Sequence, residues 1–226
     1  IGPGLGILTN ELVEKAKKVK TIEIDQKLIP YLNWTFKKYK SKLEIINQDA
    51  LKFDLPTENY KLIANIPYYI TSPILNHFLG SAKEPQKRPE LIMLLMQKEV
   101  AEKICVQTGD HSVLSLQVQI YGEPKIIKKV SAGSFFPAPK VESAILKITP
   151  FEKPLVSDEK LFFKLIKGCF LQKRKTMSNS LIRTLNLPRA EVDQIMEKAG
   201  LKPELRPQHL SIQDWEKLIQ FIVAQS

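Results

Sequence analysis

The residues with the clearest chemical potential form one short loop, Asn65-Ile66-Pro67-Tyr68, which follows an apolar segment. The amide oxygen of Asn65 and the backbone carbonyl of Ile66 can both accept a hydrogen bond from one aromatic amino group. Pro67 biases Ile66 toward an extended backbone, so we expect this carbonyl to point outward. The ring of Tyr68 offers a flat face for a base. The loop predicts chemistry on an exocyclic amine, although a plain turn with a half-buried Tyr68 also fits these four residues.

A glycine-rich segment, Ile1-Gly2-Pro3-Gly4-Leu5-Gly6, opens the sequence. Glycines at alternate positions before a helical stretch allow a strand to turn tightly beneath an adenosine-containing cofactor. Glu23 lies 17 residues after Gly6, near the end of the apolar segment 21–25. That distance is close to the ~20 residues expected for a carboxylate that binds ribose hydroxyls. A solvated acid at a strand end is the alternative interpretation.

A second acid, Asp49, follows the next apolar segment, residues 43–47. Its carboxylate can accept a hydrogen bond from an adenine amino group. Aspartate is also a common turn former, so both interpretations stay open at this position.

An aromatic loop, residues 134–140, joins the last two predicted strands. Its prolines, Pro137 and Pro139, stiffen the backbone and lower the cost of holding an aromatic ring in place. Phe135 can close on the opposite face of a base that stacks on Tyr68. The alternative is that Phe135 anchors the loop in the core.

The charge of the chain favours a nucleic-acid partner. The 226 residues carry a formal charge of +10 with a pI near 9.4. The basic excess is spread over both the first 150 residues and the remainder. A polyanionic partner accounts for this balance, and a merely soluble basic surface is the alternative.

Membrane, disulfide and metal classes are not indicated. The longest apolar run, Leu91 to Met96, is far shorter than the ~20 residues of a membrane span. The two cysteines, Cys105 and Cys169, fall in helical patterns and are typical of reduced core residues. The three histidines lie far apart, so no metal site is predicted. We therefore expect a soluble cytoplasmic protein.

Strand and helix patterns alternate over the first 150 residues, which predicts a doubly wound α/β sheet. The last two strands, joined by a loop, are expected to form an antiparallel pair at the sheet edge. A linker at residues 150–156 separates a first domain, 1–150, from a helical domain, 151–226. The expected strands are 21–25, 43–47, 61–64, 91–96, 126–130 and 141–149, and the expected helices are 10–18, 27–39, 73–79, 97–107, 112–121, 158–172, 176–185, 188–200 and 211–224. Thr9 or Asn10, Ser157 and Ser211 are the expected caps of three of these helices.

A basic cluster lies in the helical part of the chain. Lys173, Arg174 and Lys175 precede a run of Thr, Ser and Asn residues, and Arg183 follows at the end of the same helix. These side chains suit phosphate groups. A solvated helix end needs no ligand and is the alternative.

Taken together, the motifs resemble the rRNA adenine N6,N6-dimethyltransferases. They span nearly the whole chain in the family's order and are highly specific as a set. They are Ile1-Gly2-Pro3-Gly4-Leu5-Gly6, Ile22-Glu23-Ile24-Asp25, Gln48-Asp49-Ala50, Asn65-Ile66-Pro67-Tyr68, Leu95-Met96-Gln97-Lys98-Glu99-Val100 and Phe135-Phe136-Pro137-Ala138-Pro139-Lys140-Val141-Glu142-Ser143-Ala144.

This resemblance implies a class I, S-adenosylmethionine-dependent methyltransferase, with a Rossmann-like sheet and a small all-helical C-terminal domain. It implies catalytic roles in target-base binding and transfer for Asn65, Ile66, Pro67, Tyr68 and Phe135. It implies cofactor binding by Gly2, Gly4, Gly6, Glu23, Ile24, Asp49, Ala50 and Asn65, and RNA binding by Lys173, Arg174, Lys175 and Arg183, without a metal.

Two segments, Thr71–Leu75 and Gln172–Leu181, resemble the housekeeping branch of the family more than the macrolide-resistance branch. The housekeeping branch dimethylates two adjacent adenines in a loop near the 3′ end of small-subunit rRNA, during ribosome biogenesis. The expected partner is therefore small-subunit rRNA or the assembling small subunit. We expect the protein itself to be a monomer. The alternatives are a 23S rRNA adenine methyltransferase, a DNA adenine methyltransferase and a non-catalytic RNA-binding assembly factor.

The sequence departs from the family's pattern at three places. Ser178 stands where the family usually has Arg, and residues 109–115 differ from the usual sequence. The resemblance also implies a central strand before Ile1, so we expect residues 1–226 alone to bind the cofactor poorly.

Overall fold

The computed structural model describes residues 1–80, 88–107, 109–172 and 174–224. The chain divides into two compact units, Ile1–Lys98 with Ile126–Ile148 and Glu99–Lys125 with Thr149–Ser226. Residues 99–125 therefore group with the C-terminal helices, whereas the sequence suggested one boundary at residue 150. The division into a cofactor domain and an RNA domain stays a prediction.

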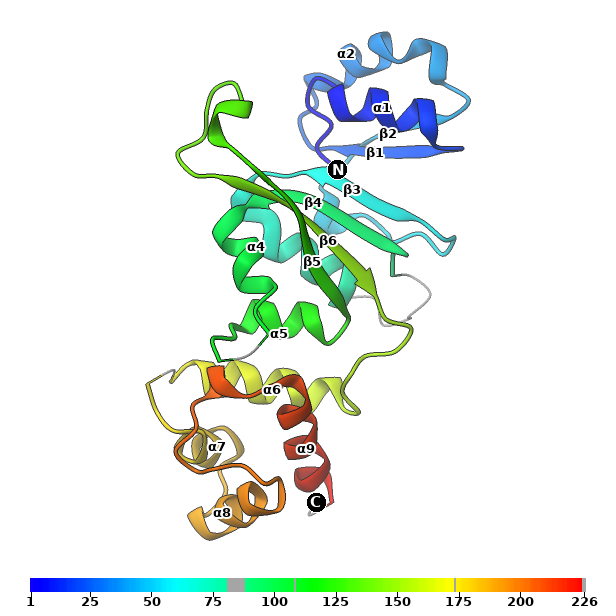
Figure 1. Cartoon of the computed structure of the whole chain (residues 1–226). Coiled ribbons are helices and arrows are strands. Elements are labelled where there is room, and N and C mark those ends of the chain that lie inside the picture. Colours follow the sequence, from blue (N-terminus) through cyan, green and yellow to red (C-terminus); the bar gives the residue numbers. More distant parts are fainter. Residues whose placement is uncertain (81–87, 108, 173, 225–226) are drawn as a thin grey trace. The chain divides into compact units, whose positions relative to one another are not determined.

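The strands of the first unit form an α/β arrangement (Figure 1). Strand β1 (Val19–Glu23) pairs in parallel with β2 (Leu43–Asn47), and β3 (Lys61–Asn65) pairs in parallel with β4 (Leu91–Gln97). Strand β4 also pairs with β6 (Ser143–Pro150), which runs antiparallel to it.

The end of the sheet is formed by β5 (Gly122–Val130), which lies beside β6 in the order β3-β4-β6-β5. Mixed sheets in which an antiparallel strand lies beside parallel strands are common in α/β folds. The expected α/β class is confirmed, and the last two strands occupy the expected edge.

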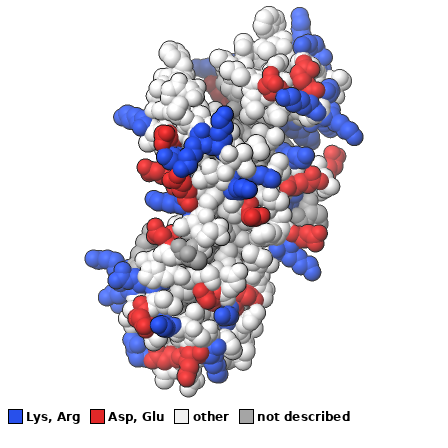
Figure 2. Space-filling model, viewed as in Figure 1, with Lys and Arg blue, Asp and Glu red and all other residues white. Residues whose placement is uncertain are grey.

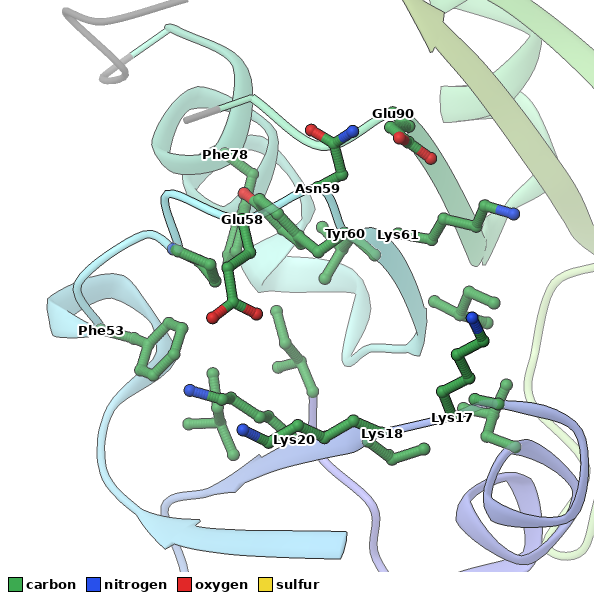
Figure 3. A pocket seen from close by; sticks show the side chains of 18 of the residues that line it. Lys17, Lys18, Lys20, Phe53, Glu58, Asn59, Tyr60, Lys61, Phe78 and Glu90 are labelled. Carbon is green, nitrogen blue, oxygen red and sulfur yellow. The ribbon is translucent and has the colours of Figure 1, made fainter. Parts of the chain in front are cut away.

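The described strands form two hydrogen-bonded sheets. Among these residues no ladder joins β1 to β3, and a cavity of about 680 Å³ is lined by residues of both strands. Figure 3 shows this cavity, with Lys18 and Lys20 on one side and Tyr60 and Lys61 on the other. Its lining includes none of the predicted site residues.

Two helices cover β1 and β2. Helices α1 (Ile7–Lys15) and α2 (Leu28–Thr35) contribute to a buried apolar cluster with the strands, made of Val13, Leu32, Phe36 and Leu43. A 3₁₀ turn, η1 (Lys37–Tyr39), follows α2. Burial of these side chains holds the two helices against β1 and β2.

The start of α1 differs from the expectation. The helix begins directly after Gly6, whose φ of 85° is left-handed, and no side chain caps it. Thr9 is buried, and the backbone N–H of Asn10 donates to the Gly6 carbonyl at 2.8 Å. The predicted caps at Thr9 and Asn10 are wrong, because the glycine turn leads straight into the first helical hydrogen bond.

Short helices lie in the connections between the strands. They are η2 (Ala50–Lys52), η3 (Tyr68–Ile70), α3 (Thr71–Leu75), the π-helical η4 (Asn76–Gly80) and η6 (Ala132–Ser134). Helix α3 follows η3 without a side-chain cap and contains Pro73 in its first turn, a position where proline is well tolerated.

The second unit is mainly helical. Its helices are α4 (Lys98–Ile104, whose first residue belongs to the first unit), α5 (Val113–Gln119), α6 (Glu159–Phe170), α7 (Met177–Leu185), α8 (Arg189–Lys198), η7 (Pro207–His209) and α9 (Ile212–Val223). Phe162 and Phe170 of α6 pack against the fully buried Trp215 of α9. This aromatic core confirms the small helical C-terminal region.

The caps of two of these helices were predicted from serines. Ser211 caps α9 as predicted, and its hydroxyl accepts the backbone N–H of Asp214. The cap of α6 is Asp158, whose carboxylate accepts the Leu161 N–H at 2.9 Å, so the prediction of Ser157 is wrong by one residue. Aspartate at this position also places a negative charge at the positive end of the helix dipole.

None of the helices described in this structure is long and apolar enough to cross a membrane. No disulfide joins Cys105 and Cys169; Cys169 is buried and Cys105 is half-buried. Burial raises the pKa of the Cys169 thiol to about 12. The expectation of reduced core thiols is met most fully at Cys169.

Candidate active site

Each of the first four strands ends in a polar residue: Glu23, Asn47, Asn65 and Gln97. Within each parallel pair these ends lie at the same edge, because β1 pairs with β2 and β3 with β4. Ligands of α/β folds bind at this carboxyl edge of the strands.

The glycine loop joins the end of β1 through a backbone hydrogen bond. The Gly2 N–H donates to the Ile22 carbonyl at 2.9 Å. The three alternate glycines, Gly2, Gly4 and Gly6, all have positive φ, a backbone conformation that residues other than glycine rarely adopt. A Cβ at Gly6 would also lie 2.5 Å from the Phe36 ring. The loop is therefore a tight turn, as predicted, with Gly2 exposed and Gly6 buried.

Glu23 is only 6% exposed and its position is fixed by its neighbours. Its Oε1 accepts the Asp25 N–H at 2.9 Å, while its carbonyl accepts from the Asn47 side chain at 2.9 Å and from the Gln48 N–H at 3.0 Å. These bonds hold the ends of β1 and β2 together. The adjacent Ile24 is exposed, so this edge offers both a carboxylate and an apolar side chain.

Asp49 begins η2 and has the turn-forming role that the sequence left open. Its Oδ1 accepts the Leu51 N–H at 2.9 Å, and Ala50 beside it is buried. A carboxylate whose orientation is fixed by one hydrogen bond keeps further acceptor capacity. The turn therefore positions the acid and does not exclude a ligand.

Asn65 is exposed at the end of β3, whereas the next side chain, Ile66, is almost completely buried. Buried Ile66 fixes the start of the loop, and Pro67 after it is extended with ψ 138°. A cavity of about 390 Å³ is lined by Asn65 together with Gly2 and Gly4. The structure thus brings the glycine loop and the predicted amine acceptor to one cavity, whose lining does not include Glu23 or Asp49.

The Tyr68 ring is held by a long-range hydrogen bond. Its hydroxyl lies 2.8 Å from Oγ of Ser143, which is fully buried at the start of β6. Ser143 is paired with Gln97 at the end of β4. The loop after β3 and the loop before β6 therefore meet at the same edge of the sheet.

The loop that contains Phe135 is anchored at both ends. At its start, the Phe135 N–H donates to the Ala132 carbonyl at 3.2 Å. At its end, the Lys98 ammonium donates to the Glu142 carboxylate at 2.6 Å, and the Lys98 backbone N–H donates to the Glu142 carbonyl at 3.0 Å. The hydrogen bond and charge of Lys98 hold the pKa of the Glu142 carboxyl below its ordinary value. Phe135 itself is half-buried.

The predicted RNA-binding residues are separated in the second unit. Arg174, Lys175 and Arg183 are exposed, while Lys173 lies outside the described residues. Arg174 and Lys175 precede α7 and Arg183 is in its last turn, so about 9 Å of helix, from Met177 to Arg183, separates them at 1.5 Å per residue. Figure 2 shows basic and acidic side chains interspersed on the visible face. The described basic residues therefore form two sites and not one cluster.

Sequence reasoning missed the side chains that position the site. They are Ser143, the Lys98–Glu142 pair, and Arg189, whose guanidinium donates to Asn179 in the first turn of α7 at 2.7 Å. These partners lie far apart in sequence, and no local pattern could have shown the contacts. Two exposed aromatic residues were also missed: Tyr69 is 85% exposed and Phe136 is fully exposed, each directly after a predicted base-binding ring.

The departures from the family pattern have local structural roles. Ser178 is buried and donates to the Asp193 carboxylate at 3.0 Å, so it ties α7 to α8. In the segment 109–115, Ser112 caps α5 by accepting the Ser115 N–H. In the described part of the chain no group of three or more His, Cys, Asp and Glu side chains is placed to hold a metal.

Comparison with known proteins agrees with this geometry. The sequence matches the family described as ribosomal RNA adenine dimethylase over residues 1–224. It is 40% identical to a ribosomal RNA small subunit methyltransferase A from Dehalococcoides mccartyi, over 96% of this chain and 76% of the relative. A protein of the same name from Clostridium botulinum is also 40% identical, over 96% of this chain and 80% of the relative.

Two solved structures have the same fold. A dimethyladenosine transferase from Plasmodium falciparum aligns with a TM-score of 0.84 at 29% identity, covering 99% of this chain and 88% of that one. The 23S rRNA methyltransferase ErmE aligns with a TM-score of 0.76 at 28% identity, covering 98% and 88%. The family match covers the glycine loop, Asn65 and the helical region alike. The chain belongs to the ribosomal RNA adenine dimethylase family and is an rRNA adenine dimethyltransferase with a class I methyltransferase fold.

Proposed function

We propose that this protein uses S-adenosylmethionine to dimethylate N6 of two adjacent adenines in a hairpin loop near the 3′ end of small-subunit rRNA. The observation that carries the proposal is the exposed Asn65 at the end of β3, in one cavity with the glycine loop. The small-subunit target is supported by the names of the relatives at 40% identity.

The residues present fit an adenosine-containing cofactor. The loop of Gly2, Gly4 and Gly6 has a backbone conformation that favours glycine, and it is hydrogen-bonded directly to β1. Glu23 and Asp49 stand at the ends of neighbouring strands, where carboxylates suit ribose hydroxyls and an adenine amino group. We assign Gly2, Gly4, Gly6, Glu23 and Ile24 to the methionine and ribose part, and Asp49 and Ala50 to the adenine. When bound, S-adenosylmethionine supplies an electrophilic methyl group.

Asn65 and Ile66 orient the target amine. The Asn65 side-chain oxygen and the Ile66 carbonyl accept hydrogen bonds from the two N–H groups of the unmethylated amine. This pairing turns the nitrogen lone pair away from ring conjugation. As the amine becomes cationic, the same two oxygens stabilise the developing positive charge. They accept stronger hydrogen bonds from the N–H groups, whose protons become more acidic. No general base is needed before the attack, because the proton becomes acidic only afterwards.

Tyr68 and Phe135 bind the two faces of the flipped base. The Tyr68 ring is held by Ser143, and the end of the loop that contains Phe135 is held by Lys98 and Glu142, before RNA arrives. Stacking contributes roughly 1–3 kcal/mol per base, which offsets the few kcal/mol that base flipping costs in a loop. The exposed Tyr69 and Phe136 are suited to stack on the nucleotides next to the target.

Arg174, Lys175 and Arg183 contact RNA phosphates, and Arg189 joins the first two near the start of α7. All four are exposed on the helical unit. Contacts to phosphates fix the register of the RNA without reading its sequence.

The deciding experiment incubates the full-length protein with labelled S-adenosylmethionine and unmethylated small subunits, then maps the modified adenines. Label on two adjacent adenines near the 3′ end of the small-subunit rRNA is the expected result. Label in large-subunit rRNA or in DNA in parallel reactions would reassign the substrate. Tight RNA binding without any transfer would indicate a non-catalytic assembly factor.

A further inference from the structure

One face of α2 carries aromatic side chains that the fold does not use. Tyr31 and Trp34 are three residues apart, a spacing that places side chains on the same side of a helix. Trp34 is 70% exposed and Tyr31 is 41% exposed. The opposite face, with Leu32 and Phe36, is buried in the cluster with α1 and β2. Large exposed aromatic residues that contribute nothing to a core mark a binding surface.

The segment that carries this face is basic, although Glu14 of α1 contacts the Tyr39 hydroxyl beside it. Between Asp25 and Glu44 the sequence has no acidic residue but has lysines at positions 27, 37, 38, 40 and 42. Lys42 donates to a main-chain carbonyl, that of Val13 at 2.9 Å, and the other four are exposed. An aromatic face with lysines on both sides suits a polyanion that also carries flat apolar groups.

Unpaired RNA is the ligand that uses both features. Its bases stack on aromatic rings and its phosphates pair with lysines, whereas an acidic protein surface would use only the lysines. Bases in a duplex are already stacked on each other, so the nucleotides must be unpaired. None of these residues lines either cavity of the first unit. The contact therefore lies outside the reacting adenine's site.

We propose that Trp34 and Tyr31 stack on unpaired bases of the RNA substrate outside the reacting loop, while Lys27, Lys37, Lys38 and Lys40 contact the neighbouring phosphates. This inference rests on the proposed function only in that the substrate is RNA. Its consequence is that part of the affinity for the RNA comes from a surface that takes no part in methyl transfer.

Intrinsic fluorescence tests the contact directly, since Trp34 is 70% exposed and the other tryptophan, Trp215, is fully buried. The full chain is titrated with deproteinised, unmethylated small-subunit rRNA. We expect the emission of the exposed tryptophan to be quenched and Trp34→Phe to lose the quenching while the emission of Trp215 remains.

Variants then separate this surface from the chemistry. Trp34→Ala should weaken RNA binding about tenfold and raise KM for RNA with kcat unchanged. Lys27→Ala should lower the salt slope of binding by about 0.7, because the protein then neutralises one phosphate fewer. The neighbouring exposed residue gives the control, because Asn33→Ala should change neither quantity.

Two results would overturn the proposal. The first is an unchanged KM and RNA affinity in Trp34→Ala while the wild-type protein still transfers methyl groups. The second is quenching by intact small subunits but not by deproteinised rRNA, which would identify a protein as the partner. A full-length wild-type protein without transfer activity, but with Trp34 quenched by rRNA, would instead contradict the proposed function and leave the α2 contact standing.

Discussion

The residues proposed to bind the cofactor and those proposed to bind RNA are held in different ways. Gly2, Glu23 and Asp49 are fixed by backbone hydrogen bonds at strand ends. Arg174 and Lys175, in contrast, are exposed side chains before a helix. A reacting amine must be placed within a fraction of an ångström, whereas a phosphate backbone is attracted over several ångströms. Rigid positioning is therefore concentrated where the chemistry occurs.

The strongest test of this contrast is Asn65→Ala. Loss of the acceptor should lower kcat by about 10²–10³-fold, as removal of one preorganised polar group does in other enzymes, with little change in RNA affinity. Single-turnover transfer and RNA titration measure the two quantities. Asn59→Ala is the matched control, since Asn59 is exposed near the opposite end of β3. Full single-turnover activity of Asn65→Ala would remove Asn65 from the mechanism.

A comparison of Gly6→Ala with Gly4→Ala tests how rigid the cofactor loop is. Both glycines have positive φ, which costs alanine about 1–2 kcal/mol. Only at Gly6 would the new Cβ meet the Phe36 ring, and overpacking of this kind adds about 1–3 kcal/mol. Urea unfolding should show the larger loss for Gly6→Ala. Equal losses would mean that α2 moves freely away from the loop.

The RNA side should respond more weakly and through salt. Replacing Arg174 and Lys175 together by alanine should weaken RNA binding several-fold and reduce its salt slope by about 0.7 for each phosphate that is no longer neutralised. The value of kcat at saturating RNA should stay unchanged. Lys198→Ala, an exposed lysine elsewhere in the same unit, serves as the control. A fall in kcat without a change in salt slope would place these residues nearer to the chemistry.

The smallest effect is expected for the pair that anchors the Phe135 loop. The hydrogen bond from Lys98 lowers the pKa of Glu142 from its ordinary value of 4.5. The pair therefore stabilises the folded protein at pH values above the ordinary pKa of Glu142. This stabilisation is lost as the pH falls through the lowered pKa of the folded state. The difference in Tm between wild type and Glu142→Gln should be small and constant near neutral pH and should shrink in acid.

A second background identifies the source of that pH dependence. With Lys98→Met already present, Glu142→Gln should have no pH-dependent effect on Tm. A difference that persists in that background would assign the pKa shift to another group.

Sequence patterns predicted the elements that depend on local periodicity. The bounds of β2 are those expected, and β3 differs only by including Asn65. Asn65 was also placed correctly at a strand end, and the glycine turn leads into a helix as expected, because a proline and alternate glycines leave clear signals.

Long-range side-chain contacts were beyond sequence reasoning. The bond from Tyr68 to Ser143 spans 75 residues, and the one from Lys98 to Glu142 spans 44. Cap positions failed for a different reason, because neighbouring residues such as Ser157 and Asp158 are both good caps and only packing decides between them.

The hydrogen bond that fixes Tyr68 also bears on how two methyl groups reach one nitrogen. A ring that is already immobile loses little conformational entropy when the base docks on it. The base can therefore leave after the first transfer and return to an unchanged surface. The same nucleotide can therefore bind again without a conformational change of the protein. This arrangement is compatible with a distributive mechanism, in which the RNA dissociates between the two transfers.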